Sequence, residues 1–178
     1  MTEVARLGAE TFGPYADACV ETYVAAMNAP AAELRSRPDL LRRHLGRPGF
    51  TAMVGLDGGR LVGFGYAYPG QSGQWWHDIV VVGLGRQAAE RWMSDSFEIV
   101  ELHVRPESQG AGLGRRLLTG LLTGAPGRTA VLSTHDRDSR ARHLYRSMEF
   151  VDLLTGFRFP GREEDYAVLG RPLPMLAG

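Results

Sequence analysis

A glycine-rich segment between residues 104 and 118 carries the clearest chemical signal in the sequence. It reads VRPESQGAGLGRRLL, which predicts a strand, a turn and an amphipathic helix that begins near Gly112. The first N–H groups of such a helix point at one place, and the helix dipole adds partial positive charge there. Glycine lets the main chain approach a bulky anion closely. The segment therefore predicts a pyrophosphate site, with added charge from Arg115 and Arg116.

Glycines alone are also typical of an ordinary turn before a surface helix, so the flanking residues decide between these interpretations. The sequence here resembles the GNAT superfamily of N-acetyltransferases, whose signature Gln/Arg-x-x-Gly-x-Gly/Ala opens a helix after a strand. Residues 109–114, QGAGLG, match it in full. A second family signature, Asn-x-x-Ala-x-x-x-Tyr followed by Gly-Phe, corresponds to residues 138–145 and 149–150, with Asp138 in place of Asn and Glu149 in place of Gly.

The resemblance implies a fold as well as a function. We expect one α/β (α+β) domain over residues 1–178, with a GNAT-type mixed, mostly antiparallel central sheet of six to seven strands and about four flanking helices. A splayed pair of strands, 97–104 and 129–134, would hold acetyl-CoA as co-substrate, and no metal is expected. By resemblance, the coenzyme contacts would come from Leu102, His103, Val104, Gln109, Gly110, Ala111, Gly112, Leu113, Gly114, Arg115 and Asp138.

Transfer of an acetyl group to an amine needs proton handling, which typically contributes about 10²–10⁴-fold to a rate. Tyr145 is the candidate acid, because in the family this tyrosine lies near the coenzyme sulfur. The alternative is a core tyrosine, since Ala141, Leu144 and Met148 share its helical face.

The strand at 97–104 supplies the candidate bases. Alternation places Glu98 on one face and Glu101 with His103 on the other. Many relatives carry a carboxylate six residues before the position of Val104, which is Glu98 here, so Glu98 is the first candidate and Glu101 the second. Both could instead be solvent-side residues. The intrinsic pKa of His103 suits a base, but a lone strand histidine is more often simply hydrogen-bonded.

The remaining chain predicts the elements that position these residues. We expect a strand at 3–7, a helix from Pro14 to Met27, a short helix after Pro38, and a hairpin of strands 50–56 and 61–68. After the coenzyme helix come a strand at 129–134, a helix capped by Asp136 or Asp138 that reaches Met148, and strand-like pieces at 150–154 and 156–169. Cys19 lies on an apolar helical face and is expected to pack rather than react, so transfer should be direct, without an acyl-enzyme.

Residues 79–89, IVVVGLGRQAA, imitate the dinucleotide fingerprint of a strand followed by Gly-x-Gly-x-x-Ala. A dinucleotide-binding fold needs two βαβ halves, and too few residues follow Gly83. We expect 69–96 to form the variable substrate-side wall, with a helix at 86–93. Trp75 and Trp76 are candidate lid residues, or alternatively core or dimer-contact residues.

The composition limits the partners and the compartment that the sequence favours. The 20 basic and 20 acidic residues balance, which gives no electrostatic reason to expect nucleic acid or a membrane surface as partner. A single cysteine and the absence of an apolar leader favour the cytoplasm. A small-molecule primary amine is the favoured acceptor. A protein or peptide amine, or a non-catalytic acyl-CoA-binding module, are the alternatives, and a homodimer is possible.

Overall fold

The computed structural model describes residues 2–30 and 32–175, and the chain divides into two compact units. The first unit contains residues 1–68 and 99–123, and the second contains residues 69–98 and 124–178. Strand β4 (Ser96–Val104) contributes its first three residues to the second unit and the rest to the first. Among the described residues, no helix has both the length and the hydrophobicity needed to cross a bilayer.

The sheet of the first unit begins with three antiparallel strands, β1 (Glu3–Leu7), β2 (Thr51–Asp57) and β3 (Arg60–Pro69). Gly58 and Gly59 connect β2 to β3 with φ values of 56° and 81°. Two consecutive positive φ values are what a two-residue hairpin turn requires. The predicted hairpin is therefore confirmed.

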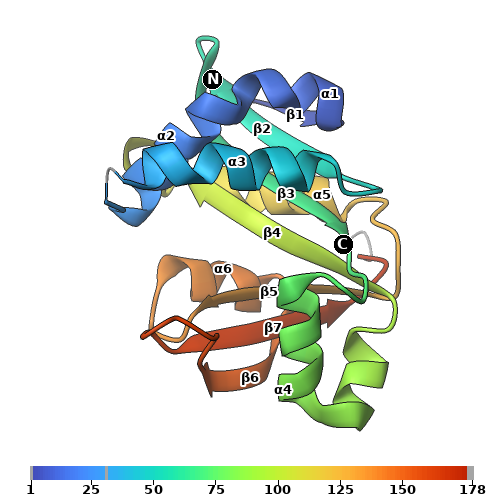
Figure 1. Ribbon diagram of the computed structural model, residues 1–178. Helices are drawn as coiled ribbons and strands as arrows, with labels where there is room; N and C mark the ends of the chain where they lie inside the picture. The colour runs from blue at the N-terminus through green and yellow to red at the C-terminus, as the bar shows by residue number, and fades with distance from the viewer. Residues whose placement is uncertain (1, 31, 176–178) are drawn as a thin grey trace. The chain divides into compact units, whose positions relative to one another are not determined.

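Helices cover one face of this sheet (Figure 1). They are α1 (Ala9–Phe12), the 3-10 turn η1 (Gly13–Tyr15), α2 (Ala16–Met27) and α3 (Glu33–Leu45). Their buried side chains join those of the strands in a core that includes Phe12, Cys19, Leu41, Phe50, Phe64 and Tyr66.

Helix α3 begins earlier than the sequence suggests, because Pro38 lies inside the helix rather than before it. Proline removes one helical hydrogen bond. The helix nevertheless continues, and it packs Leu41 and Leu45 against the core of the first unit.

Helix α5 (Leu113–Leu122) packs on the opposite face of β2 and β3, and glycines on these strands make room for it. A methyl group built on Gly55 would lie 2.9 Å from Leu113 Cδ1, and one on Gly63 would lie 3.1 Å from Leu113 Cδ2. Both distances are shorter than ordinary van der Waals contact. Because these two strand positions carry no side chain, the start of α5 can approach the sheet closely.

The second unit contains α4 (Trp75–Trp92), β5 (Thr129–His135), α6 (Arg140–Ser147), β6 (Val151–Phe157) and β7 (Tyr166–Pro172). Strands β5 and β6 each pair antiparallel with β7. The first residues of β4, Ser96 to Glu98, pair parallel with Thr129 to Val131 of β5. Seven strands with this mixed pairing confirm the predicted α/β class.

Helix α4 corrects the sequence-based expectation for residues 69–96. Residues 79–82 are helical, not a strand, and the helix bends at Gly85, where φ is 72° and ψ is 168°. Figure 1 shows the two helical segments meeting at an angle. The residues that lead directly into Gly83 are helical rather than a strand, so the structural context that a dinucleotide fingerprint requires is missing.

The N-cap of α6 also differs from the expectation. Ser139 caps the helix, and its Oγ accepts a hydrogen bond from the main-chain N–H of Arg142 at 3.2 Å. The guanidinium of the buried Arg142 forms an ion pair with Asp152 of β6 at 2.7 Å. Asp136 instead accepts from the N–H of Gly156. This network fixes α6, and with it Tyr145, against β6.

Candidate active site

The strand–turn–helix junction that the sequence predicts is present in the first unit. After Val104 the chain passes through the 3-10 turn η2 (Pro106–Ser108). The Nε2 of Gln109 donates to the carbonyl oxygen of Val104 at 2.9 Å and closes the turn. Gly110 and Gly112 have φ values of 84° and 76°, which L-residues rarely adopt. These two glycines therefore shape the loop that leads into α5.

The loop is open on its outer side. Residues 109–112 are exposed, and a methyl group built on Gly110 or Gly112 would meet no atom within 4 Å. The N–H of Gln109 donates to Pro106 O at 3.2 Å, so the N–H groups directed at an anion are expected from 110–114. The first N–H groups of an α-helix lack intrahelical partners. The junction therefore fits the pyrophosphate group of a coenzyme.

The two arginines after the loop differ in their surroundings. Arg115 is exposed at the start of α5, whereas Arg116 Nη1 donates to the carbonyl oxygen of Thr2 at 3.0 Å. Arg116 thus attaches the N-terminal segment to α5. Arg115 remains the candidate for a phosphate contact.

Strand β4 places Glu101 at the centre of a polar cluster in the first unit. Its Oε1 accepts from Arg37 Nη1 of α3 at 2.8 Å, and its Oε2 is hydrogen-bonded to His103 Nε2. The Arg37 guanidinium lies 3.2 Å from the centre of the Tyr23 ring, and Tyr23 also meets the His103 ring edge-on at 5.0 Å. As alternation predicts, Glu101 and His103 are on the same face, but they are partly buried rather than solvent-side.

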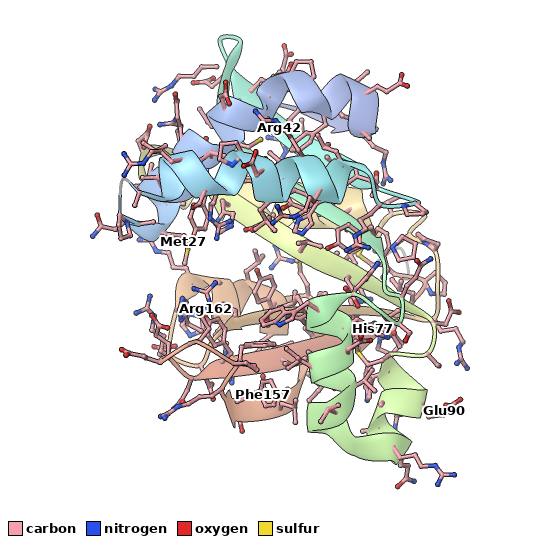
Figure 2. The ribbon with its side chains drawn as sticks, in the orientation of Figure 1. Met27, Arg42, His77, Glu90, Phe157 and Arg162 are labelled. Carbon is pink, nitrogen blue, oxygen red and sulfur yellow. The ribbon has the colours of Figure 1, made fainter. Side chains whose placement is uncertain are left out.

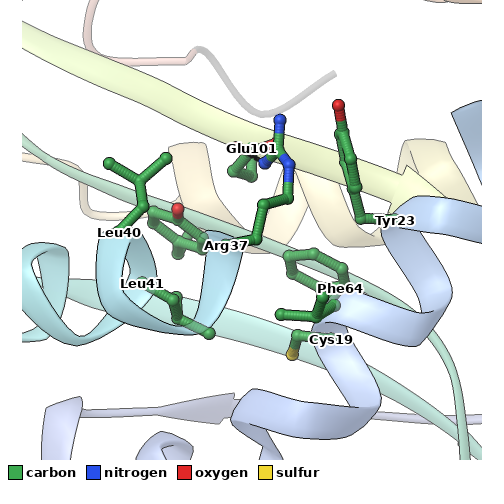
Figure 3. A pocket seen from close by; sticks show the side chains of 9 residues that line it. Cys19, Tyr23, Arg37, Leu40, Leu41, Phe64 and Glu101 are labelled. Atoms are coloured by element: carbon green, nitrogen blue, oxygen red, sulfur yellow. Dashed lines mark hydrogen bonds and ion pairs between the residues drawn. The ribbon is translucent and has the colours of Figure 1, made fainter. Parts of the chain in front are cut away.

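The electrostatics of this cluster favour an ionised Glu101. Burial raises the pKa of its carboxyl, but the hydrogen bond and charge of His103, together with Arg37, outweigh burial and lower the pKa to about 2. The cluster borders a small pocket, partly open to solvent, whose lining is mostly apolar or aromatic. Figure 3 shows Arg37 reaching between Leu40 and Tyr23 toward Glu101.

Two further groups near the pocket are held in their neutral forms. Burial raises the pKa of the Cys19 thiol, and Glu101 raises it further. The side chain of Cys19 is 1% exposed, so it packs in the core and lacks the thiolate that a nucleophile needs. Burial also lowers the pKa of His44 to about 4, and His44 Nδ1 is 2.9 Å from the Tyr66 hydroxyl.

Glu98 lies in the second unit and is not a solvent-side residue. Its side chain is 3% exposed and its Oε1 lies 2.7 Å from Nδ1 of His77 on α4, which is 7% exposed. Figure 2 labels His77 on the first segment of α4. The sequence did not identify His77, Arg37 and Tyr23 as partners of β4, because no spacing rule connects them to this strand.

Tyr145 and Asp138 also lie in the second unit. Tyr145 is 7% exposed and its ring centre is 5.9 Å from that of Phe150. Asp138 is exposed and forms an ion pair with His143 at 2.9 Å. Residues 109–114 belong to the first unit, so the positions of Tyr145 and Asp138 beside the coenzyme stay predictions.

The adjacent tryptophans have different environments within the second unit. Trp76 packs against the core, and its Nε1–H donates to Ser133 Oγ at 3.0 Å. Trp75 is 58% exposed, with its ring centre 5.9 Å from that of Phe159. Trp76 is thus held by packing and Trp75 is mostly exposed, and the substrate-side role of both stays a prediction. Among the described residues, no three His, Cys, Asp or Glu side chains group in a way that could hold a metal ion.

Comparison with known proteins decides the family. The model of the Acetyltransferase (GNAT) family matches residues 17–150. The chain belongs to this family. GNAT proteins are acyltransferases that typically depend on acetyl-CoA, so the chain is an acyltransferase.

Individual GNAT relatives agree in sequence and in fold. A GCN5-like protein acetyltransferase of Mycobacterium tuberculosis is 34% identical over 183 aligned positions, which cover 86% of this chain and 89% of the relative. The ribosomal-protein-S18-alanine N-acetyltransferase of Escherichia coli has a similar fold, with a TM-score of 0.66 at 19% identity over 100% of this chain and 97% of that chain. NAA60 of Arabidopsis thaliana, solved with acetyl-CoA, has a TM-score of 0.62 at 15% identity over 97% of this chain and 99% of that chain. The predicted GNAT fold is confirmed.

Proposed function

We propose that this GNAT protein is an N-acetyltransferase that transfers the acetyl group of acetyl-CoA to a primary amine. The observation that carries the proposal is the loop at Gly110 and Gly112, whose positive φ values present an open main chain at the start of α5. This arrangement suits two linked phosphates, because helix N–H groups and the helix dipole attract anions.

The chain's own residues supply binding and orientation. The N–H groups of 110–114 and the guanidinium of Arg115 would hold the pyrophosphate. By resemblance, the main chain of Leu102, His103 and Val104 would contact the pantetheine and acetyl groups. A main-chain N–H directed at the thioester carbonyl would stabilise the negative charge that develops there. Asp138 is proposed as a further pantetheine contact.

Direct transfer is the proposed mechanism. The acceptor nitrogen forms a bond to the thioester carbonyl carbon, the carbon–sulfur bond breaks, and the leaving thiolate takes up a proton. Holding both reactants in contact lowers the barrier, because orientation alone contributes about 7–11 kcal/mol in favourable cases. Burial of Cys19, the one cysteine in the chain, supports a route without a cysteine acyl-enzyme.

Tyr145 is proposed as the acid that protonates the thiolate. Its ring packs against Phe150, which restricts its orientation. A phenol with a pKa near 10 holds its proton at neutral pH and can donate it to a thiolate.

The acceptor is proposed to be a small-molecule primary amine, with the exposed Trp75 and the neighbouring Trp76 forming part of the wall beside it. A protein amine is the second candidate. The observation that favours it is the 34% identical relative, which is named a protein acetyltransferase.

Turnover of acetyl-CoA with a defined amine panel tests the proposal. The panel contains spermidine, an aminoglycoside, an amino acid, Nα-acetyl-lysine and an alanine-terminated peptide, and release of the coenzyme thiol is the readout. We expect turnover with at least one amine, and a fall of about 10²-fold or more in kcat for Tyr145→Phe, with KM for acetyl-CoA little changed.

Binding measurements separate the alternatives. Tight binding of acetyl-CoA without turnover on any amine would favour a non-catalytic module. An unchanged kcat in Tyr145→Phe would remove the role of this residue while leaving the transfer activity in place.

A further inference from the structure

We propose that His103 is the base that takes the proton from the acceptor amine, and that Glu101 and Arg37 position it. This inference deepens the proposed function and rests on it. The first unit places His103 and the two positioning residues in one hydrogen-bonded cluster, with Arg37 on α3 and Glu101 on β4.

Glu101 itself is poorly suited to accept a proton. Both of its carboxylate oxygens already accept hydrogen bonds, Oε1 from Arg37 and Oε2 from His103. Its pKa of about 2 makes it a weak base at neutral pH. A buried carboxylate in this state orients its neighbours rather than exchanging protons with a substrate.

The ionised carboxylate also determines which nitrogen of His103 carries the proton. A carboxylate without a proton only accepts hydrogen bonds, so the hydrogen bond to Glu101 requires Nε2 to be protonated. In a neutral imidazole the other nitrogen is then unprotonated. Nδ1 has no hydrogen-bond partner among the described residues. The neutral ring is therefore set up to accept a proton at Nδ1.

The orientation of the ring is fixed on several sides. Tyr23 of α2 meets it at 5.0 Å with an interplanar angle of 89°, and Phe64 of β3 lies 5.6 Å away. With the Glu101 hydrogen bond, these contacts leave the imidazole little freedom to rotate. In the proposed function, the main chain of His103 lies beside the acetyl group. The imidazole is attached at this position and is therefore close to the reacting atoms.

Glu98 is a weaker candidate for the same role. It is almost fully buried in the second unit and hydrogen-bonded to His77. A proton from an acceptor amine would need a relay to reach it. The imidazole of His103 is partly exposed, and only its Nε2 is engaged by Glu101.

The acceptor nitrogen loses two protons in the proposed step. The acceptor enters as an ammonium ion and gives one proton to Nδ1 of His103, which becomes an imidazolium hydrogen-bonded to the Glu101 carboxylate. The neutral amine attacks the carbonyl carbon, and the carbon–sulfur bond breaks. The nitrogen loses its second proton when the amide forms, and the thiolate takes up one proton. The imidazolium returns its proton to solvent.

The groups around His103 come from three elements. Glu101 on β4 is hydrogen-bonded to its Nε2, Arg37 on α3 pairs with Glu101, and Tyr23 on α2 contacts both His103 and Arg37. Loss of Glu101 or Arg37 should therefore disturb the placement of the imidazole.

The pH dependence of kcat/KM tests the proposal, measured on the amine that the panel identifies. In the wild-type protein kcat/KM should fall at low pH as His103 becomes protonated. Glu101→Gln and Arg37→Gln should lower kcat and leave the KM for the amine little changed, because both residues position the imidazole. His103→Gln should lower kcat/KM about 10²-fold or more and abolish the limb, whereas His44→Gln, a second histidine of the same unit, should keep it.

Two measurements distinguish loss of the base from misfolding of the variants. In wild-type protein labelled with ¹⁵N-histidine, the NMR titration of His103 should have the same midpoint as the acid limb. In His103→Ala, added imidazole should restore part of the activity.

The possible failures are distinguishable. An acid limb retained in His103→Gln, or an NMR midpoint that differs from the kinetic one, would overturn the proton role and leave the acetyltransferase standing. Wild-type protein that acetylates no amine would overturn both.

Discussion

Nδ1 of His77 lies 2.7 Å from Oε1 of Glu98, and both side chains are buried in the second unit. The two residues are 21 positions apart in the sequence, one on α4 and the other on β4. A methyl group on Gly70 would lie 2.8 Å from the same His77 nitrogen, so the glycine leaves room for the pair. The pair joins α4 to the start of β4.

Replacement of His77 by alanine should destabilise the protein. It would leave Glu98 buried without this partner, and loss of one partner of a buried hydrogen bond typically costs about 1–3 kcal/mol. We expect a decrease of this size in the free energy of unfolding measured with urea. His143→Ala, which removes a histidine exposed together with its partner Asp138, should change stability little. Equal effects of the two variants would contradict a stabilising role for the buried pair.

Gly110→Ala should weaken binding of acetyl-CoA. The residue has a φ of 84°, and an L-residue with left-handed backbone costs roughly 1–2 kcal/mol. The altered loop should raise the KM for acetyl-CoA, determined by initial rates.

Gly58→Ala is the matched control for the coenzyme loop, because Gly58 lies in the β2–β3 turn with a φ of 56° and open space around it. It should cost similar stability without changing KM. A raised KM in both variants would point to general strain rather than to the coenzyme loop.

Arg37→Gln and Arg42→Gln compare two arginines on α3. Arg37 pairs with Glu101, and both side chains are less than 20% exposed, whereas Arg42 and Asp39 are each more than 60% exposed. Hydrogen bonds to charged groups contribute about 1.5–3 kcal/mol when shielded, and surface pairs contribute about 0–1 kcal/mol. The midpoint of urea unfolding should fall clearly for Arg37→Gln and barely for Arg42→Gln; the reverse order would show that the Glu101 cluster is not stabilising.

His44 predicts a loss of stability in mild acid. Its pKa in the folded protein is lowered to about 4 by burial, against an ordinary value near 6.5. Between these pH values the unfolded chain binds a proton that the folded chain does not, so the free energy of unfolding falls as the pH drops from 6.5 toward 4. Urea unfolding at several pH values should show this slope, and His44→Gln should reduce it. An identical slope in the variant would assign the effect to other groups.

Local sequence patterns predicted the parts of the fold that depend on local conformation. Gly58 and Gly59 allow a tight hairpin wherever they occur, and residues 109–114 begin a helix after a strand because glycine permits the turn. The family resemblance rested on the same kind of short-range pattern, and the family comparison confirmed it.

The sequence was less informative where packing between distant residues determines the conformation or the partner of a residue. Residues 79–82 are β-branched or apolar and are followed by two glycines, which imitates a strand and turn, but they form part of α4. Alternation along β4 separated Glu98 from Glu101, yet it could not show that His77 and Arg37 would be their partners. Those pairings depend on how α4 and α3 pack within their units, which no local spacing encodes.

Two strand glycines next to Leu113 limit how this acetyltransferase can be altered. Leu113 is the first residue of α5, and it fills the space that side chains at Gly55 and Gly63 would otherwise occupy. A larger residue at either strand position would therefore displace the start of α5. Under the proposed function, the affinity for the acetyl donor can thus change through substitutions on β2 and β3 as well as within the loop at 110–114.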